Sequence, residues 1–288
     1  MDDPDAPRRV AAIVDDPTYA PAERDTGFLE HDDTRGVRLQ MDYLKAELQL
    51  RKHDIAHTIV VFGSTRIVEP AAALRQVETD RDAVARAPDD RDALRRLARS
   101  ERILVDSRYY EIARELGRRV GAAGERASGG RIVVATGGGP GLMEAANRGA
   151  FDVGARSIGL NITLPDVQFP NPYVTPGLCF QFHYFAIRKL HFLLRARALV
   201  AFPGGFGTFD ELFETLTLIQ TGKIAPIPVI LVGESYWRRA IDLEFLVEEG
   251  VIDPEDQALF WFAETAADVW NGIVDWYRAA GRPLVPAE

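Results

Sequence analysis

The chain has 288 residues, of which 47% are hydrophobic and 27% are charged, and its 34 basic and 43 acidic residues give a net charge of −9. This composition is typical of a globular protein that buries a core. The acidic balance argues against nucleic acid as a partner, because proteins that grip phosphate backbones present a basic face. A local basic pocket for one small phosphate is still compatible with it.

The single cysteine, Cys179, excludes a disulfide framework or a cysteine-based zinc site within one chain. The five histidines form no HExxH sequence, so we predict no bound metal. No run of 18 apolar residues occurs and the first ten residues lack an apolar signal core, so we expect no transmembrane helix and no membrane partner. Cytoplasmic residence is the expectation that follows.

The first 54 residues are predicted to form an N-terminal arm and a helix. Residues 1–34 are rich in Asp, Pro and Arg and show weak periodicity, which indicates an extended or partly ordered arm. Residues 35–52 carry apolar side chains at mostly helical spacing. This pattern predicts an amphipathic helix that packs on the main body or on a partner subunit.

The rest of the chain, residues 55–288, alternates predicted strands with predicted helices. The strands begin at residues 57, 131, 156, 178, 198 and 226, and the helices cover 109–124, the segment after the turn 136–141, 183–197, about 207–221, 235–248 and 264–280. The strands are continuous apolar runs, which are typical of a parallel sheet covered on both faces. The sequence therefore predicts an α/β fold: a Rossmann-like, doubly wound parallel sheet with a helical N-terminal extension.

Residues 67–106 interrupt this alternation. Arg, Asp and Ala dominate the segment, and charges of both signs alternate, as in RDAVARAPDDRDALRRLARSER. This pattern predicts a charged, solvated helical insertion in the 55–288 domain. A surface decoration without chemistry is the favoured interpretation.

Two predicted strand-to-helix turns are rich in glycine: TGGGPG at 136–141 and PGGFGT at 203–208. In an open parallel sheet, ligands bind beyond the carboxyl ends of the strands. A helix that starts there presents unpaired N–H groups and the positive end of its dipole, and glycine lets an anion approach the backbone closely. One such turn alone is explained by tight chain reversal, but two together favour a ligand that carries a phosphate.

The sequence does not match three other common motifs: the dinucleotide-binding glycine loop, the Walker A loop and the nucleophile turn of α/β-hydrolases. A GxGxxG loop would need glycine at Leu142, and the strand that should end in a ribose-binding acid ends in Asn161, so an NAD(P) site is disfavoured. Gly222-Lys223 is followed by Ile224, which disfavours a Walker A loop. No GxSxG stretch is present, so an α/β-hydrolase would lack its nucleophile.

Asp210 and Glu211 directly follow the second glycine turn. In a helix that begins near Gly207 they would lie in the first turn and complement the helix dipole. That explanation fits less well beside a phosphate-binding loop, because a carboxylate repels the phosphate. A carboxylate that faces such a ligand should meet positive charge, either from an arginine or from a cation that develops during reaction.

Candidate arginines for that role follow two of the predicted strands. Arg66 comes after the first strand, and Arg188 and Arg195 share a face of the predicted helix 183–197. Arginine suits phosphate or carboxylate because it can donate two parallel hydrogen bonds. For Arg195 a surface position is the favoured interpretation, whereas Arg66 is equally compatible with a binding role and a surface role.

The stretch PGGFGTFDE (203–211) fits the PGGxGTxxE pattern of the Lonely Guy (LOG) family, whose members were long labelled possible lysine decarboxylases. GGGPGLMEAANRGA (137–150) is similar to the family's other glycine motif. Further similar segments are SIGLNITLP (157–165), NPYVT (171–175), FAIRK (185–189) and LTLIQTGKI (216–224). The resemblance covers about residues 57–280, with the arm and the insertion outside it.

The resemblance implies hydrolysis of the N-glycosidic bond of a nucleoside 5′-monophosphate, either AMP or a cytokinin riboside monophosphate, to free base and ribose 5-phosphate. It implies no cofactor, a Rossmann-like fold, and a homodimer or higher homo-oligomer with sites at the dimer interface. By motif match, Glu211 takes the position of the catalytic glutamate and Arg188 that of the catalytic arginine. Shorter members have Met-His-Glu where this chain has Phe185-Ala186-Ile187, so the chain resembles the longer branch and the accepted base stays open.

Cleavage of a ribosyl C–N bond builds positive charge on the sugar, which a fixed carboxylate can stabilise while it orients or deprotonates a water. Glu211 is the candidate for that role, and Arg188 could position Glu211, bind the phosphate or assist the departing base. Glu144 could bind ribose hydroxyls or serve only at its helix start. The expected phosphate and nucleotide contacts are Ser64, Arg66, Gly137, Gly138, Gly139, Lys189, Gly204, Gly205, Gly207 and Thr208.

An alternative function comes from a different class: a nucleotide-binding or molybdenum-cofactor-binding carrier without turnover. Molybdenum-cofactor carriers resemble this superfamily and share its glycine loops. The presence of both Arg188 and Glu211 favours the enzyme. An assay of free base released from nucleoside monophosphates separates the two.

Overall fold

The computed structural model describes residues 3–124, 131–163 and 169–284. Its centre is a seven-stranded sheet in the order β4-β3-β2-β1-β5-β6-β7, and every adjacent pair is parallel. The strands are β1 (Ile55–Phe62), β2 (Arg131–Thr136), β3 (Ser157–Ile162), β4 (Cys179–Phe182), β5 (Ala196–Ala201), β6 (Val229–Val232) and β7 (Trp261–Ala263). The chain builds outward from β1 in one direction and then returns to build outward from β5 in the other. The carboxyl ends of β1 and β5 therefore mark the topological switch point, where open α/β sheets bind ligands.

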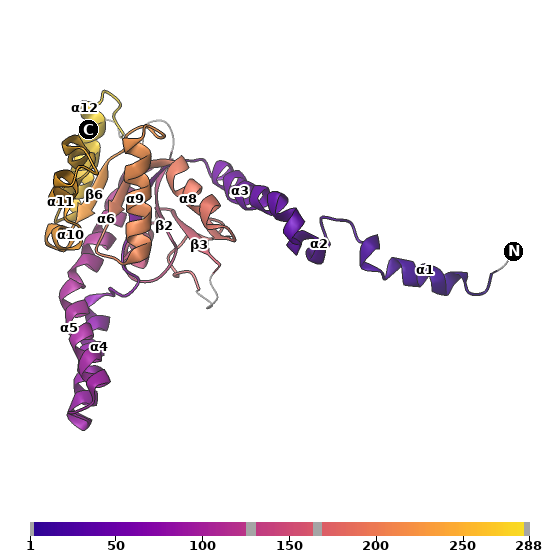
Figure 1. Ribbon diagram of the computed structural model, residues 1–288, viewed down its shortest axis with the longest axis horizontal. Coiled ribbons are helices and arrows are strands. Elements are labelled where there is room, and N and C mark those ends of the chain that lie inside the picture. The colour runs from indigo at the N-terminus through magenta and orange to yellow at the C-terminus, as the bar shows by residue number, and fades with distance from the viewer. Residues whose placement is uncertain (1–2, 125–130, 164–168, 285–288) are drawn as a thin grey trace.

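Helices cover both faces of the sheet (Figure 1), and this confirms the predicted α/β, Rossmann-like, doubly wound fold. One face packs against α6 (Arg108–Gly124), α7 (Leu142–Asp152) and α12 (Ala266–Ala279). The other packs against α3 (Arg35–Lys52), α8 (Phe185–Leu194), α9 (Phe206–Gln220) and α10 (Glu234–Ala240). Alternate residues of β1 serve the two layers: Ile59 and Val61 lie in the first core, Val60 and Phe62 in the second.

The N-terminal arm contains short helices rather than an extended chain: α1 (Ala6–Val14), the 3₁₀ turns Pro17–Tyr19 and Asp32–Thr34, and α2 (Thr26–Glu30). Neither α1 nor α2 buries a residue, and Figure 1 shows this part of the chain reaching away from the sheet. The helix predicted at 35–52 is confirmed as α3, which is anchored by the buried Ala46 and Leu50. Among the described helices, none is both long enough and apolar enough to span a bilayer.

Arg195 is the first clear correction to the sequence analysis. Its guanidinium forms two hydrogen bonds with the Glu47 carboxylate, at 2.8 and 3.0 Å, and the two side chains are only 13% and 7% exposed. The surface interpretation of Arg195 is therefore wrong. Its partner lies 148 residues away in sequence on α3, so helical spacing could not reveal the pair.

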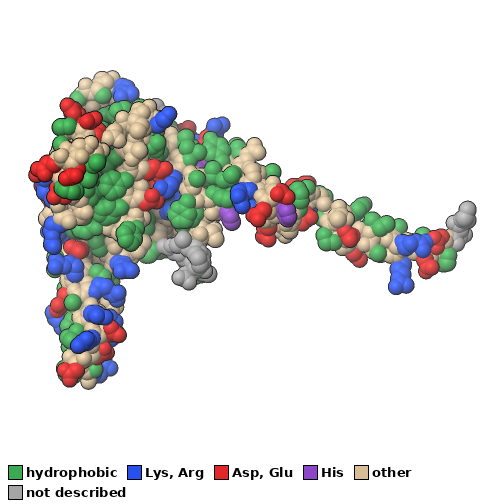
Figure 2. Space-filling model, in the orientation of Figure 1, with side chains coloured by type: hydrophobic (Ala, Val, Ile, Leu, Met, Phe, Trp, Pro, Cys, Tyr) green, Lys and Arg blue, Asp and Glu red, His purple; other side chains and the backbone are tan. Residues whose placement is uncertain are grey.

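The segment 67–106, predicted to be a charged helical insertion, is mostly helical in the structure. It forms the helices α4 (Pro70–Arg86) and α5 (Arg91–Asp106), which pack against each other and project from the sheet as a hairpin (Figure 1). Basic and acidic side chains are interspersed over its surface (Figure 2). Each helix buries few residues, in agreement with the many charged residues of this segment in the sequence.

The C-terminal part differs from the prediction at two points. The single helix expected at 235–248 is two helices, α10 and α11 (Leu243–Glu248), because the Asp242 side chain accepts a hydrogen bond from the amide of Phe245 and starts a new helix. The short edge strand β7 and the 3₁₀ turn Pro254–Leu259 were not predicted. Three residues are too few to show a strand period.

Candidate functional site

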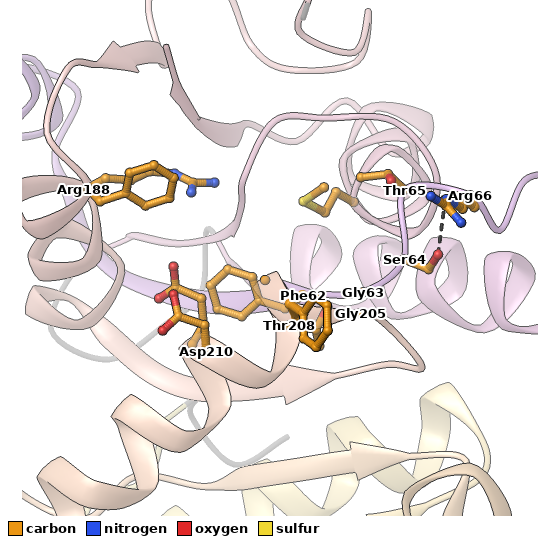
Figure 3. Close-up of a pocket in the computed structure, with 14 residues that line it drawn as sticks. Phe62, Gly63, Ser64, Thr65, Arg66, Arg188, Gly205, Thr208 and Asp210 are labelled. Atoms are coloured by element: carbon orange, nitrogen blue, oxygen red, sulfur yellow. Dashed lines mark hydrogen bonds between the residues drawn. The ribbon is translucent and has the colours of Figure 1, made fainter. Parts of the chain in front are cut away.

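Three loops meet at the carboxyl edge of the sheet, around the switch point. The loop after β1 contacts both glycine turns: the Ser64 amide donates to the carbonyl of Pro203 (3.0 Å), and the Ser64 carbonyl accepts from the amide of Leu142 (3.1 Å). The loop after β1, the turn PGGFGT with the start of α9, Met143 of α7 and the start of α8 line a cavity of about 570 Å³. Figure 3 shows Ser64, Thr65 and Arg66 on one side of it and Arg188 with Asp210 on the other.

The turn PGGFGT ends in the start of α9. Gly205 is the N-cap and Phe206 the first helical residue, and Thr208 already donates its amide to the carbonyl of Gly205 (2.9 Å). Within the described ranges, the amides of Phe206 and Gly207 donate no hydrogen bond. Gly205, Phe206, Gly207 and Thr208 all line the cavity. The cavity therefore has unpaired donors and the positive end of a helix dipole at one wall, which together favour an anion.

Asp210 and Glu211 do not lie in the first turn of this helix, as the sequence analysis expected. Because α9 already begins at Phe206, its first turn holds no acid, and both carboxylates lie in the second turn. The helix dipole falls off within the first turn, so it does not explain them. Both residues line the cavity.

Glu211 is a buried acid, with only 6% of its surface exposed. Burial raises the pKa of its carboxyl from 4.5 to about 7, although the positive charges of Arg188 and Lys189 act in the opposite direction. In the part of the chain that the structure describes, no salt bridge within 4.0 Å joins Glu211 to Arg188. The carboxyl can therefore exist in either protonation state near neutral pH.

Arg188 extends from α8 across the end of β3. Its Nε donates to the carbonyl of Leu160 (2.7 Å), and its guanidinium lies 5.1 Å from the ring centre of Phe192 and 6.0 Å from that of Phe185. Desolvation lowers the pKa of Arg188, and the charge of Glu211 raises it. A side chain at Gly137 would meet the guanidinium, at 2.7 Å from its NH2 group, so this glycine leaves room for Arg188.

The glycines of the first turn, Gly137, Gly138 and Gly139, are buried behind the cavity and do not line it; of the helix that follows, Met143 does. Gly138 has φ +71°, and a side chain there would collide with Asn161. The backbone amide of Gly138 donates to the Thr136 hydroxyl (2.9 Å), so its hydrogen is not available to a ligand.

A buried amide network holds this first turn. The Asn171 side-chain amide donates to the carbonyl of Gly139 and to Asn147, both at 3.0 Å, and Thr136 donates to Asn147 at 2.7 Å. Sequence reasoning missed Asn147 and Asn171. Polar residues inside a predicted helix and a loop were the available signal, but their partners lie up to 32 residues away.

Two other predicted site residues are engaged elsewhere. Lys189 pairs with Asp210 (2.8 Å) and with Glu214 (3.1 Å), and it does not line the cavity. Glu144 accepts a hydrogen bond from the Tyr110 hydroxyl (3.0 Å) and is also outside the lining.

Gly204 is needed by the fold, because an added side chain would overlap Thr208. Its carbonyl accepts a hydrogen bond from Tyr236 (2.5 Å). At Gly205 and Gly207, by contrast, an added side chain would meet nothing within 4 Å. On the side of the cavity facing Arg188, the backbone amide of Arg66 donates to the Ser64 hydroxyl (3.1 Å). The structure thus brings together Ser64, Arg66, Arg188, Gly205, Gly207, Thr208 and Glu211.

Comparisons of the sequence with a family model and with curated proteins agree on one family. A family model described as possible lysine decarboxylase matches residues 143–273. The probable cytokinin riboside 5′-monophosphate phosphoribohydrolase LOGL3 of Oryza sativa subsp. japonica is 27% identical over 168 residues, which cover 54% of this chain and 74% of that protein. The cytokinin riboside 5′-monophosphate phosphoribohydrolase LOG1 of Arabidopsis thaliana is 30% identical over 144 residues, which cover 49% of this chain and 66% of that protein.

Among solved structures, the molybdenum cofactor binding protein from the phototrophic bacterium Rippkaea orientalis aligns with 22% identity. The alignment covers 58% of this chain and 87% of that chain, with a TM-score of 0.41. A likeness at this level supports no conclusion about function.

Proposed function

Because this chain belongs to the Lonely Guy (LOG) family, we propose that it hydrolyses the N-glycosidic bond of nucleoside 5′-monophosphates, releasing free base and ribose 5-phosphate. AMP and cytokinin riboside monophosphates are the proposed substrates. The observation that carries the proposal is the buried carboxylate of Glu211, with a pKa of about 7, in the same cavity as the unpaired amides at the start of α9.

The phosphate end of the substrate is proposed to lie against the start of α9. The amides of Phe206 and Gly207 and the hydroxyl of Thr208 supply donors there, and the open space beside Gly207 lets a phosphate approach the backbone. Ser64 and Arg66, from the loop after β1, are proposed as further contacts. This arrangement anchors the ribose one helical turn from Glu211.

The reaction proposed for Glu211 is general-base attack of water on the anomeric carbon of the ribose. The ionised carboxylate takes a proton from water, the water oxygen bonds to the carbon, and the C–N bond electrons leave with the base. The base takes one proton from solvent, and Glu211 returns the one it took to solvent, so that one water is consumed for each bond broken. The negative charge also stabilises the cation that develops on the sugar. A pKa near 7 suits this role, because a base works best when its pKa lies near the operating pH.

Arg188 is proposed to act with Glu211 from the same side of the cavity. In the described part of the chain it has no carboxylate within salt-bridge distance, so its charge is available to an anionic group of the substrate. It also holds part of the Glu211 population in the ionised form, because it is the largest influence that lowers that pKa. Both effects support catalysis at neutral pH.

A homodimer or larger homo-oligomer is part of the proposal. The outer face of α3 exposes Val37, Met41, Leu44 and Leu48, and the neighbouring α8 exposes Leu190 and Leu194. These residues form two apolar stripes at helical spacing on packed helices. An exposed apolar surface of this kind supports a subunit contact. Light scattering of the full chain, with Leu44→Glu as the disrupting variant, tests it.

The test of the proposed activity uses the full chain with AMP, GMP, CMP and a cytokinin riboside 5′-monophosphate, and measures free base and ribose 5-phosphate together. We expect equimolar release of the two products, abolished by Glu211→Gln and unaffected by Glu244→Gln, an exposed control on α11. Tight nucleotide binding without base release from any of these compounds would reject hydrolysis in favour of a binding function.

A further inference from the structure

Two phenylalanines stand at the cavity with large parts of their rings exposed. Phe206 is 96% exposed and Phe185 is 50% exposed, and both line the cavity that contains Arg188 and Glu211. Large apolar side chains at that level of exposure contribute little to the core. Their presence at the mouth of a ligand cavity calls for a ligand that has an apolar face.

The backbone fixes where these rings lie. Phe206 is the first residue of α9 and Phe185 the first residue of α8, so two helix starts carry them. Phe206 stands between Gly205 and Gly207, where an added side chain would meet nothing within 4 Å. Phe206 is itself 96% exposed, so almost none of its surface is covered by the protein.

The described side chains that line the cavity offer no amide group to the edge of a base. Among the described residues that line it, none is Asn or Gln, the side chains that read base edges with paired donors and acceptors. The start of α9 is assigned to the phosphate and Glu211 to the sugar. An exposed aromatic ring binds a base by its face, and every base offers a π-face.

We propose that Phe206, assisted by Phe185, is the platform on which the nucleobase stacks, so that the cavity holds the base by its face and tolerates different groups on its edge. This inference rests on the proposed function and adds the substrate range to it. A site that reads hydroxyl or amino groups by buried hydrogen bonds rejects analogues by ~10⁴–10⁵. Without such readout, kcat/KM for AMP, GMP and an N6-substituted AMP should fall within about 100-fold of one another.

The experiment uses 2-aminopurine riboside 5′-monophosphate, whose fluorescence is quenched when the base stacks. Binding is measured to Glu211→Gln, which is expected to hold the probe without cleaving it, and to the same chain with Phe206→Ala, Phe206→Trp or Phe213→Ala. Phe213 is the matched control, since it is 39% exposed on the same helix but outside the cavity lining. Ribose 5-phosphate is titrated in parallel as a ligand without a base.

We expect Phe206→Ala to weaken probe binding by at least about fivefold and to remove the quenching, while the affinity for ribose 5-phosphate stays unchanged. Phe206→Trp should keep both signals, and Phe213→Ala should behave as the parent. In the chain with Glu211 intact, Phe206→Ala should raise KM for AMP more than it lowers kcat.

Three outcomes overturn the inference alone: unchanged affinity and quenching in Phe206→Ala, an equal loss of affinity for ribose 5-phosphate, or a changed oligomeric state without any base-dependent effect. The second outcome would make Phe206 a structural residue of the phosphate loop, and the third would make it a subunit contact. If the chain with Glu211 intact neither binds nor cleaves any nucleotide, the proposed function falls and takes this inference with it.

Discussion

Glu211→Gln should make the protein more stable, and the gain should depend on pH. Burial raises the pKa of Glu211 from 4.5 to about 7, which corresponds to about 3 kcal/mol between the folded and unfolded states. Between these two pH values the folded state binds more protons than the unfolded state, so the stability of the wild type falls as pH rises through this window. Above pH 7 the full free-energy cost of burying the ionised Glu211 carboxylate is present, and below pH 4.5 that cost is absent.

Urea unfolding of both chains at pH 5 and pH 8 measures this effect. Glutamine carries no charge to desolvate, so we expect the variant to exceed the wild type by about 3 kcal/mol at pH 8 and by less than about 1 kcal/mol at pH 5. The exposed Glu244→Gln control should show no such difference. An equal effect of Glu211→Gln at both pH values, or a loss of stability at pH 8, would refute a buried, desolvated carboxyl at this position.

Four further substitutions test the surroundings of the site. Gly207→Ala should raise KM for AMP by about tenfold, because its methyl group enters the space proposed for the phosphate, while urea unfolding shows no loss of stability. Gly204→Ala should instead lower the free energy of unfolding by about 1–3 kcal/mol, because its methyl group overlaps the buried Thr208. Lys189→Met should move the acid limb of the pH profile of kcat/KM upward, because the positive charge of Lys189 lowers the pKa of Glu211; an unmoved limb would separate that limb from Glu211. Arg195→Met should lower the free energy of unfolding in urea by up to about 3 kcal/mol, because the buried Glu47 carboxylate loses both hydrogen bonds from Arg195 and keeps only the one from Arg51. AMP cleavage should be unchanged, because Arg195 directly precedes β5 and so lies at the sheet edge opposite to the cavity; lost activity at intact stability would contradict this.

The sheet was predictable because its strands are buried on both faces. Continuous apolar runs such as 57–62 and 198–201 identify them in the sequence, and α3 matches its predicted bounds because its apolar periodicity is regular. The three-residue β7 and the break at Asp242 were not predictable by the same reasoning. A short edge strand has no period, and one aspartate inside a helical pattern looks like a surface residue until its cap is seen.

The candidate site was predictable where a local motif determines it. PGGFGTFDE identifies Gly205, Gly207 and Glu211, because one turn and the helix it starts hold all three. Adjacent residues on a helix point about 100° apart, so sequence alone could not distinguish the roles of Arg188 and Lys189. The structure directs Arg188 to the cavity and Lys189 to the acids of α9.

Long-range partners account for the rest of what the sequence could not reveal. Glu144 accepts a hydrogen bond from the hydroxyl of Tyr110, which lies 34 residues earlier in the chain. The exposure of Phe206 is likewise a property of the assembled loops, since a phenylalanine between glycines is as compatible with a core position as with a ligand cavity. Tertiary contacts decide such cases, and no local pattern encodes them.

The measurement that tests the account most directly is the release of adenine and ribose 5-phosphate from AMP by the wild type and by Glu211→Gln, compared at equal occupancy with bound AMP. The account predicts equimolar products from the wild type and a rate lower by ~10²–10³ in the variant, with AMP binding retained. Equal rates in the two chains would contradict the role of Glu211 and, with it, the proposed chemistry of this cavity.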